Sequence, residues 1–134
     1  GFPGETEDEF AETVDFVRKA DFYETHIFKY SRRRGTAADK MAGQLSDAVK
    51  HERSKALIEI NEEKKKAFED FYISGKRRAE VLFEDMENAG GVSYRTGYTR
   101  EYIKVYDISG THGAGDIADG TLARQGNMVL FEGQ

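Results

Sequence analysis

Hydrophobic residues first recur at helical spacing near the start of the chain. Phe10, Val14 and Val17 fall on one face of a helix. The preceding Thr6 and Glu9 match a capping box, in which each side chain bonds the backbone amide of the other residue. Acidic residues in the first turn and basic residues in the last favour the helix dipole. The pattern predicts a helix from about residue 6 to residue 20.

A longer helical pattern occupies the middle of the chain. Ser46 and Asp47 provide an N-cap, and the period continues to about Ile73. The apolar stripe comprises Val49, Ala56, Leu57, Ile60, Ala67, Phe68 and Phe71. At ~1.5 Å per residue such a helix is about 40 Å long, which suits a connector between two bodies. Its opposite face interleaves Glu and Lys, as solvated helix faces do.

Between these helices, residues 23–30 are aromatic and β-branched, and both alternating faces are largely apolar. This pattern predicts a strand that is buried on both sides, as in a parallel sheet covered by helices. His26 is therefore expected to be buried and hydrogen-bonded. Helix, loop and strand in this order make one αβ step of a repeated βα architecture.

After Gly75 the period changes from helical to alternating. The runs that read as short strands are 78–84, 93–99, 102–108, 117–124 and 128–131. Glycine-rich turns at residues 88–91 and 111–115 separate some of them, and His112 in the second turn is expected to be exposed. Five short strands predict a small antiparallel β-barrel. The fold class is α+β.

The composition excludes several kinds of chemistry but does not identify a function. The chain has 134 residues and no Cys, which excludes disulfides, cysteine nucleophiles and thiolate-bound metals. The three His residues lie too far apart to suggest a metal site. The net charge of −5 is unevenly distributed, because residues 1–22 are acidic and residues 23–45 are basic. Nucleic-acid binding must therefore depend on local patches.

Three stretches resemble one enzyme family. Residues 1–6 (GFPGET) are similar to the turn after a late barrel strand, residues 30–36 (YSRRRGT) to a Y-S-x-R-x-G-T loop, and residues 50–53 (KHER) to the start of a connecting helix. In this order they resemble the radical S-adenosylmethionine methylthiotransferases of the MiaB, RimO and MtaB type, with the MtaB branch favoured. The C-terminal strands stand where that family has a TRAM domain, an OB-like RNA-binding module.

The resemblance implies three parts: the last αβ step of a truncated radical-SAM barrel (1–45), a long connecting helix (46–75) and a five-stranded OB-like TRAM β-barrel (76–134). The parent enzyme would add a methylthio group to a modified adenosine, favoured as threonylcarbamoyladenosine at tRNA position 37, through a 5′-deoxyadenosyl radical. It would use S-adenosylmethionine and two 4Fe–4S clusters held by upstream cysteines. We expect this chain to be a cytoplasmic fragment truncated at Gly1, to bind no cluster and to be inactive alone.

The resemblance also implies a cofactor wall. Gly1, Pro3, Gly4 and Glu5 would lie beside S-adenosylmethionine, where glycines allow close approach and a helix N-terminus offers free amides. From the second motif, Ser31 and Arg33 would join them, with Arg33 as the motif arginine; Arg32 and Arg34 would contact phosphate or solvent. The alternatives are a plain strand-to-helix turn and a solvated loop.

Aromatic and basic residues alternate between residues 94 and 106. If Ile103 and Val105 face the core, their neighbours point outward, where tyrosines can stack on bases and cations can meet phosphates. The candidate RNA contacts are Tyr94, Arg95, Tyr98, Arg100, Tyr102 and Lys104. The alternative is an ordinary barrel rim.

Expected partners are the anticodon region of tRNA and the missing N-terminal part of the protein, with no membrane. Two rival hypotheses remain: a non-enzymatic RNA-binding module, and self-association in which the long helix is an oligomerisation element. Truncation would favour the second by exposing apolar surface at Phe10, Val14, Ile27 and Phe28.

Overall fold

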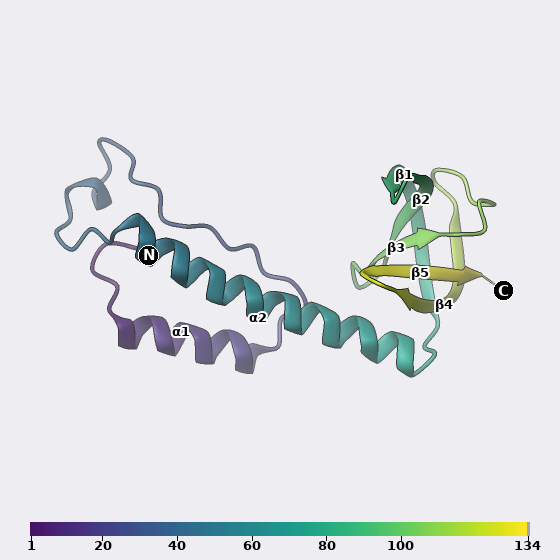
Figure 1. Cartoon of the computed structure of the whole chain (residues 1–134), viewed down its shortest axis with the longest axis horizontal. Helices are drawn as coiled ribbons and strands as arrows, with labels where there is room; N and C mark the ends of the chain where they lie inside the picture. The colour runs from purple at the N-terminus through teal and green to yellow at the C-terminus, as the bar shows by residue number, and fades with distance from the viewer. Residues whose placement is uncertain (134) are drawn as a thin grey trace. The chain divides into compact units, whose positions relative to one another are not determined.

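The computed structural model describes residues 1–133 and divides into two units, Gly1–Lys66 and the residues from Ala67 onward. We call them the helical unit and the sheet unit (Figure 1). Two α-helices, with a short 3-10 helix (Ala38–Lys40) between them, precede five strands, which confirms the α+β class. The second helix runs from the first unit into the second.

Both helices form where the hydrophobic pattern predicts them. Helix α1 spans Glu7–Ala20, and its capping box is present: the Glu9 amide donates to Thr6 Oγ1 (3.2 Å) and the Thr6 amide to Glu9 Oε2 (2.8 Å). Helix α2 spans Asp47–Ser74, with the Val49 amide donating to Ser46 Oγ. The 28 residues of α2 match the predicted connector length.

The predicted strand at residues 23–30 is wrong. This segment is extended but belongs to no sheet, because no other strand of the described chain lies beside it to supply backbone partners. It runs back along α2 instead, with the Thr25 amide donating to Asn61 Oδ1 at 2.7 Å. One of its faces is open, since Phe28 is 86% exposed. His26 is likewise exposed rather than buried.

Five strands form the sheet unit: β1 (Ala79–Ala89), β2 (Val92–Thr99), β3 (Lys104–Asp107), β4 (Ile117–Gln125) and β5 (Met128–Gly133). Their order, β1-β2-β3-β5-β4, closes into a ring. The sheet is mixed rather than antiparallel as predicted, because β3 and β5 pair in parallel. The long 108–116 connection allows this, since it lets the chain place β4 beside β1 before β5 returns to β3.

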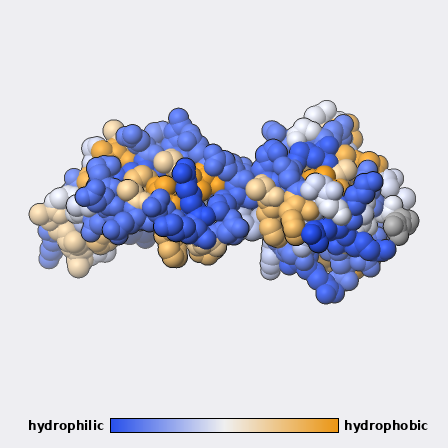
Figure 2. Space-filling view, turned by 90° about the horizontal axis from the view of Figure 1, so that it is seen from below, coloured by the Kyte–Doolittle hydropathy of each residue, from blue (hydrophilic) through white to orange (hydrophobic). Residues whose placement is uncertain are grey.

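Alternating side chains fill the ring. Phe83, Phe131, Ile103, Val81 and Val105 are its largest fully buried side chains, which confirms that Ile103 and Val105 face the core. Gly120 makes room for this packing, because a Cβ there would lie 2.6 Å from the Phe131 ring. On the face of the molecule shown in Figure 2, apolar surface forms separate patches on both units.

The loop after β3 is anchored by a buried carboxylate. Asp107 accepts hydrogen bonds from Ser109 and from the His112 ring, whose Nδ1 lies 2.9 Å from Asp107 Oδ2. The ring stacks on Phe83 with 4.5 Å between centroids. The prediction that His112 is exposed is therefore wrong, because aromatic packing and Asp107 draw it inward.

Candidate nucleic-acid interface

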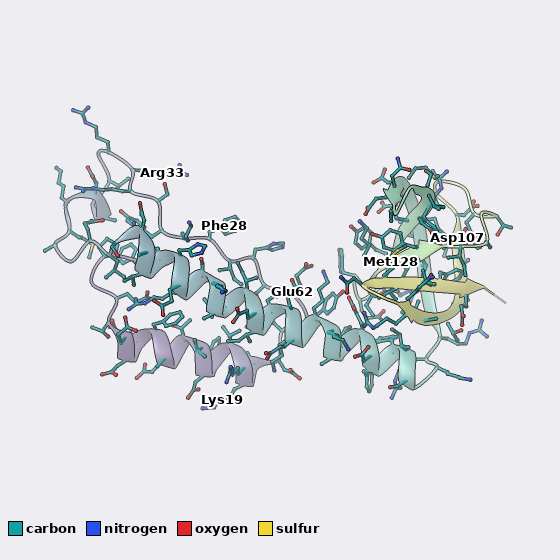
Figure 3. All side chains as sticks on the ribbon, in the orientation of Figure 1. Lys19, Phe28, Arg33, Glu62, Asp107 and Met128 are labelled. Carbon is teal, nitrogen blue, oxygen red and sulfur yellow. The ribbon has the colours of Figure 1, made fainter. Side chains whose placement is uncertain are left out.

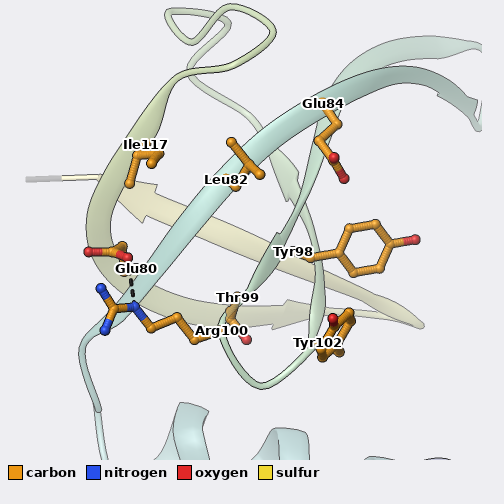
Figure 4. Close-up of a pocket in the computed structure, with 8 residues that line it drawn as sticks. All are labelled: Glu80, Leu82, Glu84, Tyr98, Thr99, Arg100, Tyr102 and Ile117. Carbon is orange, nitrogen blue, oxygen red and sulfur yellow. Dashed lines mark hydrogen bonds and ion pairs between the residues drawn. The ribbon is translucent and has the colours of Figure 1, made fainter.

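An open hollow of about 630 Å³ lies on the outer face of the sheet (Figure 4). We call it the Tyr98 hollow; it is lined by Glu80, Leu82, Glu84, Tyr98, Thr99, Arg100, Tyr102 and Ile117. Three of the six residues predicted to contact RNA, Tyr98, Arg100 and Tyr102, therefore meet in one place. Apolar and aromatic side chains supply much of its surface, as in sites that bind planar rings.

Strand register explains why these side chains gather. Ile117, Leu82 and Tyr98 are successive cross-strand neighbours on β4, β1 and β2. Such neighbours stand side by side on one face of a sheet. The inward neighbours of Leu82, Val81 and Phe83, are fully buried, so Leu82 must face outward. The result is a short apolar row across three strands.

The turn between β2 and β3 holds Tyr102 beside this row. Tyr102 adopts a left-handed backbone (φ 66°) and is 74% exposed. Buried Thr99 fixes the turn, since its hydroxyl accepts from the amides of Glu101 and Ile103 at 3.2 Å each. A non-glycine residue rarely adopts this conformation without support. The turn therefore keeps an exposed aromatic ring in a defined position.

Two of the three cations predicted to contact phosphate, Arg100 and Lys104, are already paired. Arg100 Nε donates to Glu80 Oε1 at 2.7 Å, and Lys104 Nζ is bonded to Glu87. The Lys104 bond, followed by one from Tyr106, lowers the pKa of Glu87, so this carboxylate stays ionised near neutral pH. Ion pairs of this kind near the surface break readily, but the carboxylates reduce the net positive charge that this surface offers to RNA.

Tyr94 and Arg95 lie elsewhere on the sheet. They line a second hollow of about 270 Å³ with Met86, Ile108 and His112. Tyr94 also meets Tyr106 edge-on, with centroids 5.9 Å apart. Five of the six predicted residues thus divide between two hollows, and Lys104 lines neither of these two.

The N-terminal turn is tied to two later segments. Gly4, at φ 86°, donates its amide to the Gly43 carbonyl at 2.9 Å. Phe2 meets Tyr30, next to Ser31, with ring centroids 5.4 Å apart. The turn lines an open hollow of about 380 Å³ whose walls are Phe2, Pro3, Gly4, Glu5, Glu9 and Thr13. The first two resembling motifs therefore come together through Phe2 and Tyr30.

This hollow suits a cation better than an anion. The expectation of free helix amides is wrong for Thr6 and Glu9, because the capping box already occupies both. Glu5 and Glu9 add carboxylates to the walls. Burial opposes ionisation of Glu5, but hydrogen bonds from the amino terminus and Arg53 outweigh it and lower the pKa of Glu5.

Arg53 ends the third resembling stretch but is not among the predicted site residues. Its side chain is only 6% exposed, and its Nη1 donates to the Glu5 carbonyl (3.1 Å) and carboxylate (2.6 Å). Its Nη2 reaches Glu7 Oε1 at 2.5 Å. The sequence held one signal: Arg53 lies midway between Val49 and Leu57, four residues from each, within the apolar stripe.

The arginines of the basic loop differ in their contacts. Arg32 Nε donates to Asp39 Oδ1 at 2.7 Å, so this arginine stabilises the fold of the loop. Within the described residues, the side chains of Ser31 and Arg33 make no hydrogen bond, and both residues are exposed (Figure 3). The structure thus leaves the motif arginine available to a ligand.

Among residues 1–133, no group of three His, Asp or Glu side chains could hold a metal ion. No helix in this part of the chain is long and apolar enough to cross a membrane.

Comparison with known proteins identifies relatives of the chain. No protein-family model matches it. Threonylcarbamoyladenosine tRNA methylthiotransferase MtaB of Bacillus subtilis is 38% identical over 107 residues, which are 78% of this chain and 23% of that protein. The tRNA-2-methylthio-N(6)-dimethylallyladenosine synthase of Caldicellulosiruptor saccharolyticus is 51% identical over 63 residues (47% and 13%). That of Finegoldia magna is 38% identical over 106 residues (76% and 22%). The chain thus spans less than a quarter of these relatives.

Proposed function

We propose, from the homology of this chain to the C-terminal fifth of the MtaB and MiaB methylthiotransferases, that its sheet unit docks tRNA for a methylthiotransferase. The parent reaction would be methylthiolation of a modified adenosine. The observation that carries the proposal is the Tyr98 hollow, where Tyr98 and Tyr102 stand exposed beside Leu82 and Ile117. Exposed aromatic faces bind unpaired bases by stacking. In this role the closed sheet is a TRAM-like, OB-like barrel.

The helical unit would contribute part of the cofactor site. Gly4 leaves open space where a Cβ would stand, and Glu5 and Glu9 favour a positively charged group. S-adenosylmethionine has such groups, its amine and its sulfonium, and when bound it supplies the radical that activates the substrate. Pro3 and Gly4 would contact it, Glu5 would face its charge, and Gly1, Ser31 and Arg33 would lie around it. Without Cys, no residue here fits an iron–sulfur cluster.

A tRNA-binding measurement tests the docking role. Fluorescence anisotropy of labelled tRNA with the 134-residue chain at low salt should show binding, and Tyr98→Ala with Tyr102→Ala should weaken it about ten-fold or more, at ~1–3 kcal/mol per stacked base. Phe28→Ala is the matched control, because Phe28 is also an exposed aromatic residue but lies in the helical unit. Equal loss in all variants, or no binding at low salt, would refute the proposal.

Self-association is a second candidate that one observation favours. Phe16 and Phe28 are 64% and 86% exposed in the helical unit. Apolar exposure on this scale often marks a surface that another chain covers. Sedimentation velocity over a range of concentrations would show a rising mass if copies associate, and a constant monomer mass would exclude it.

A further inference from the structure

The second hollow of the sheet unit, which we call the Arg95 hollow, is separate from the Tyr98 hollow. The two share no lining residue. Both are reached from β2, where Tyr94 and Tyr98 lie four residues apart, or about 13 Å along a strand. A single extended ligand could therefore reach both, while a small one would occupy either alone.

Arg95 supplies the positive charge of this hollow, and the Asp107 carboxylate also lines it. Its Nη1 donates to the Glu84 carbonyl at 3.1 Å, whereas its buried Nε has no partner. Asp107 is its cross-strand neighbour. However, both oxygens of that carboxylate are already engaged by the loop that follows, and no ion pair joins the two residues within the described part of the chain.

The state of Arg95 contrasts with that of the cations around the first hollow. Arg100 is paired with Glu80 and Lys104 with Glu87. For Arg95, no carboxylate of the described residues lies within ion-pair distance, and no acceptor meets its second terminal nitrogen. A guanidinium in this state can still bind phosphate or a base edge through two parallel hydrogen bonds.

Apolar and aromatic side chains form other walls of the Arg95 hollow. Met86, Val92 and Ile108 are each about half exposed (53%, 51% and 54%), and Tyr94 adds an aromatic ring. Apolar walls beside a guanidinium fit a planar ring with acceptor atoms and a nearby negative charge. A volume of about 270 Å³ suits one such unit, since pockets for drug-sized molecules start at roughly 300 Å³.

We propose that the Arg95 hollow receives one unstacked nucleotide of the RNA that the Tyr98 hollow engages, an inference that rests on the proposed tRNA-docking function. The base packs against Met86, Val92 and Tyr94, and Arg95 binds its phosphate or its edge. Strand β2 then holds the RNA at two points. Arg95, rather than Arg100 or Lys104, carries the salt-dependent part of the affinity from this face.

The test is anisotropy of a labelled anticodon stem-loop with the 134-residue chain at four salt concentrations. Arg95→Met keeps the aliphatic stem and should weaken binding about five-fold or more, while the slope of log affinity against log salt falls by about one. Arg18→Met is the matched control, because Arg18 is an exposed arginine of α1 that lines neither hollow, and its slope should stay at the wild-type value. Arg95→Lys keeps the charge, so it should restore the slope but not the full affinity, and it covers the case in which Arg95→Met fails to fold.

The outcomes separate this inference from the proposed function. If Arg95→Met and Arg95→Lys bind like the wild type while Tyr98→Ala weakens binding, the Arg95 hollow is no nucleotide site and the docking role stands. If Arg95→Met spares RNA but abolishes binding of polyglutamate, the hollow serves an acidic protein segment and the inference is wrong. If the wild type binds no RNA, both fail together with the Tyr98 prediction.

Discussion

Different interactions stabilise the helical unit and the sheet unit internally. The sheet unit buries nine aliphatic or aromatic side chains, Ala79, Val81, Phe83, Ile103, Val105, Leu122, Val129, Leu130 and Phe131. In the helical unit, apart from Pro3, only Ile60 is a fully buried apolar residue among those described, and α1 buries none. Its segments are joined instead by charged contacts, such as those of Arg53 with Glu5 and of Lys64 with Asp21.

This difference has a functional meaning. Apolar burial does not depend on attraction between charges, whereas ion pairs near the surface do and are screened by salt. The Tyr98 and Arg95 hollows therefore have a firm scaffold. The N-terminal turn depends on charges and on one buried guanidinium, so it should respond to salt, pH and substitution far more readily.

The largest expected effect comes from the core of the sheet unit. Phe83→Ala removes a fully buried ring that contacts Phe131 and His112, and should destabilise that unit by about 3–5 kcal/mol. Leu82→Ala, one residue away on the outer face, is the control and should cost far less. Urea denaturation followed by near-ultraviolet circular dichroism measures both. Equal losses would contradict the assignment of the core.

A smaller effect should follow in the helical unit from Arg53→Met. The variant leaves the Glu5 carboxylate without its buried partner, which should cost about 1–3 kcal/mol locally. The Gly4 amide, bonded to Gly43, should then exchange faster with solvent. Lys55→Met removes only an exposed contact to Glu59 and should leave that rate unchanged. Slow Gly4 exchange in Arg53→Met would show that the turn does not depend on Arg53.

Acid should act on the sheet unit through Asp107. Burial alone would raise the pKa of Asp107, but hydrogen bonds from Ser109 and His112 outweigh it, so the pKa is lowered. The stabilisation is therefore complete above the unfolded value, about 3.9, and is lost as pH falls through the folded pKa. Asp107→Asn should cost about 1 kcal/mol at neutral pH and should flatten the loss below pH ~4, measured by thermal melts. An unchanged acid profile would contradict this role.

Periodicity could predict the helices and strands because local patterns determine them. Thr6 and Glu9 specify a cap within one turn, and alternation from Arg78 onward marks the strands. What periodicity could not show is which strands pair. The parallel contact of β3 with β5 depends on a loop whose course Asp107 and His112 fix through tertiary contacts. The strand predicted at residues 23–30 does not form, because a segment with a strand-like pattern needs a neighbouring strand to pair with.

The candidate site was predictable only in part. Tyr98 and Tyr102 could be expected to point outward once Ile103 and Val105 were placed in the core. The pairing of Arg100 with Glu80 could not be foreseen, because the two residues meet only through the register of β1 and β2. The role of Arg53 could not be predicted, because its partner Glu5 lies 48 residues away in the sequence and meets it only in the folded chain.

The smallest expected effect concerns the carboxylates that pair with cations beside the Tyr98 hollow. Glu80→Gln with Glu87→Gln would free Arg100 and Lys104, and should raise tRNA affinity only about two- to five-fold at low salt. Glu62→Gln with Glu63→Gln, in the helical unit, removes the same two charges and is a control that should change little. Anisotropy titrations compare the three. A gain of a hundred-fold would show that charge, and not stacking, dominates binding by this face.

The most direct test of the docking role is a map of where RNA touches the chain. Amide and tyrosine-ring NMR signals of the labelled 134-residue protein would be followed while an anticodon stem-loop is added. We expect the largest shifts at Tyr94, Arg95, Tyr98 and Tyr102, with the signals of α1 unmoved. Shifts confined to the helical unit, or no shifts at saturating RNA, would contradict the account.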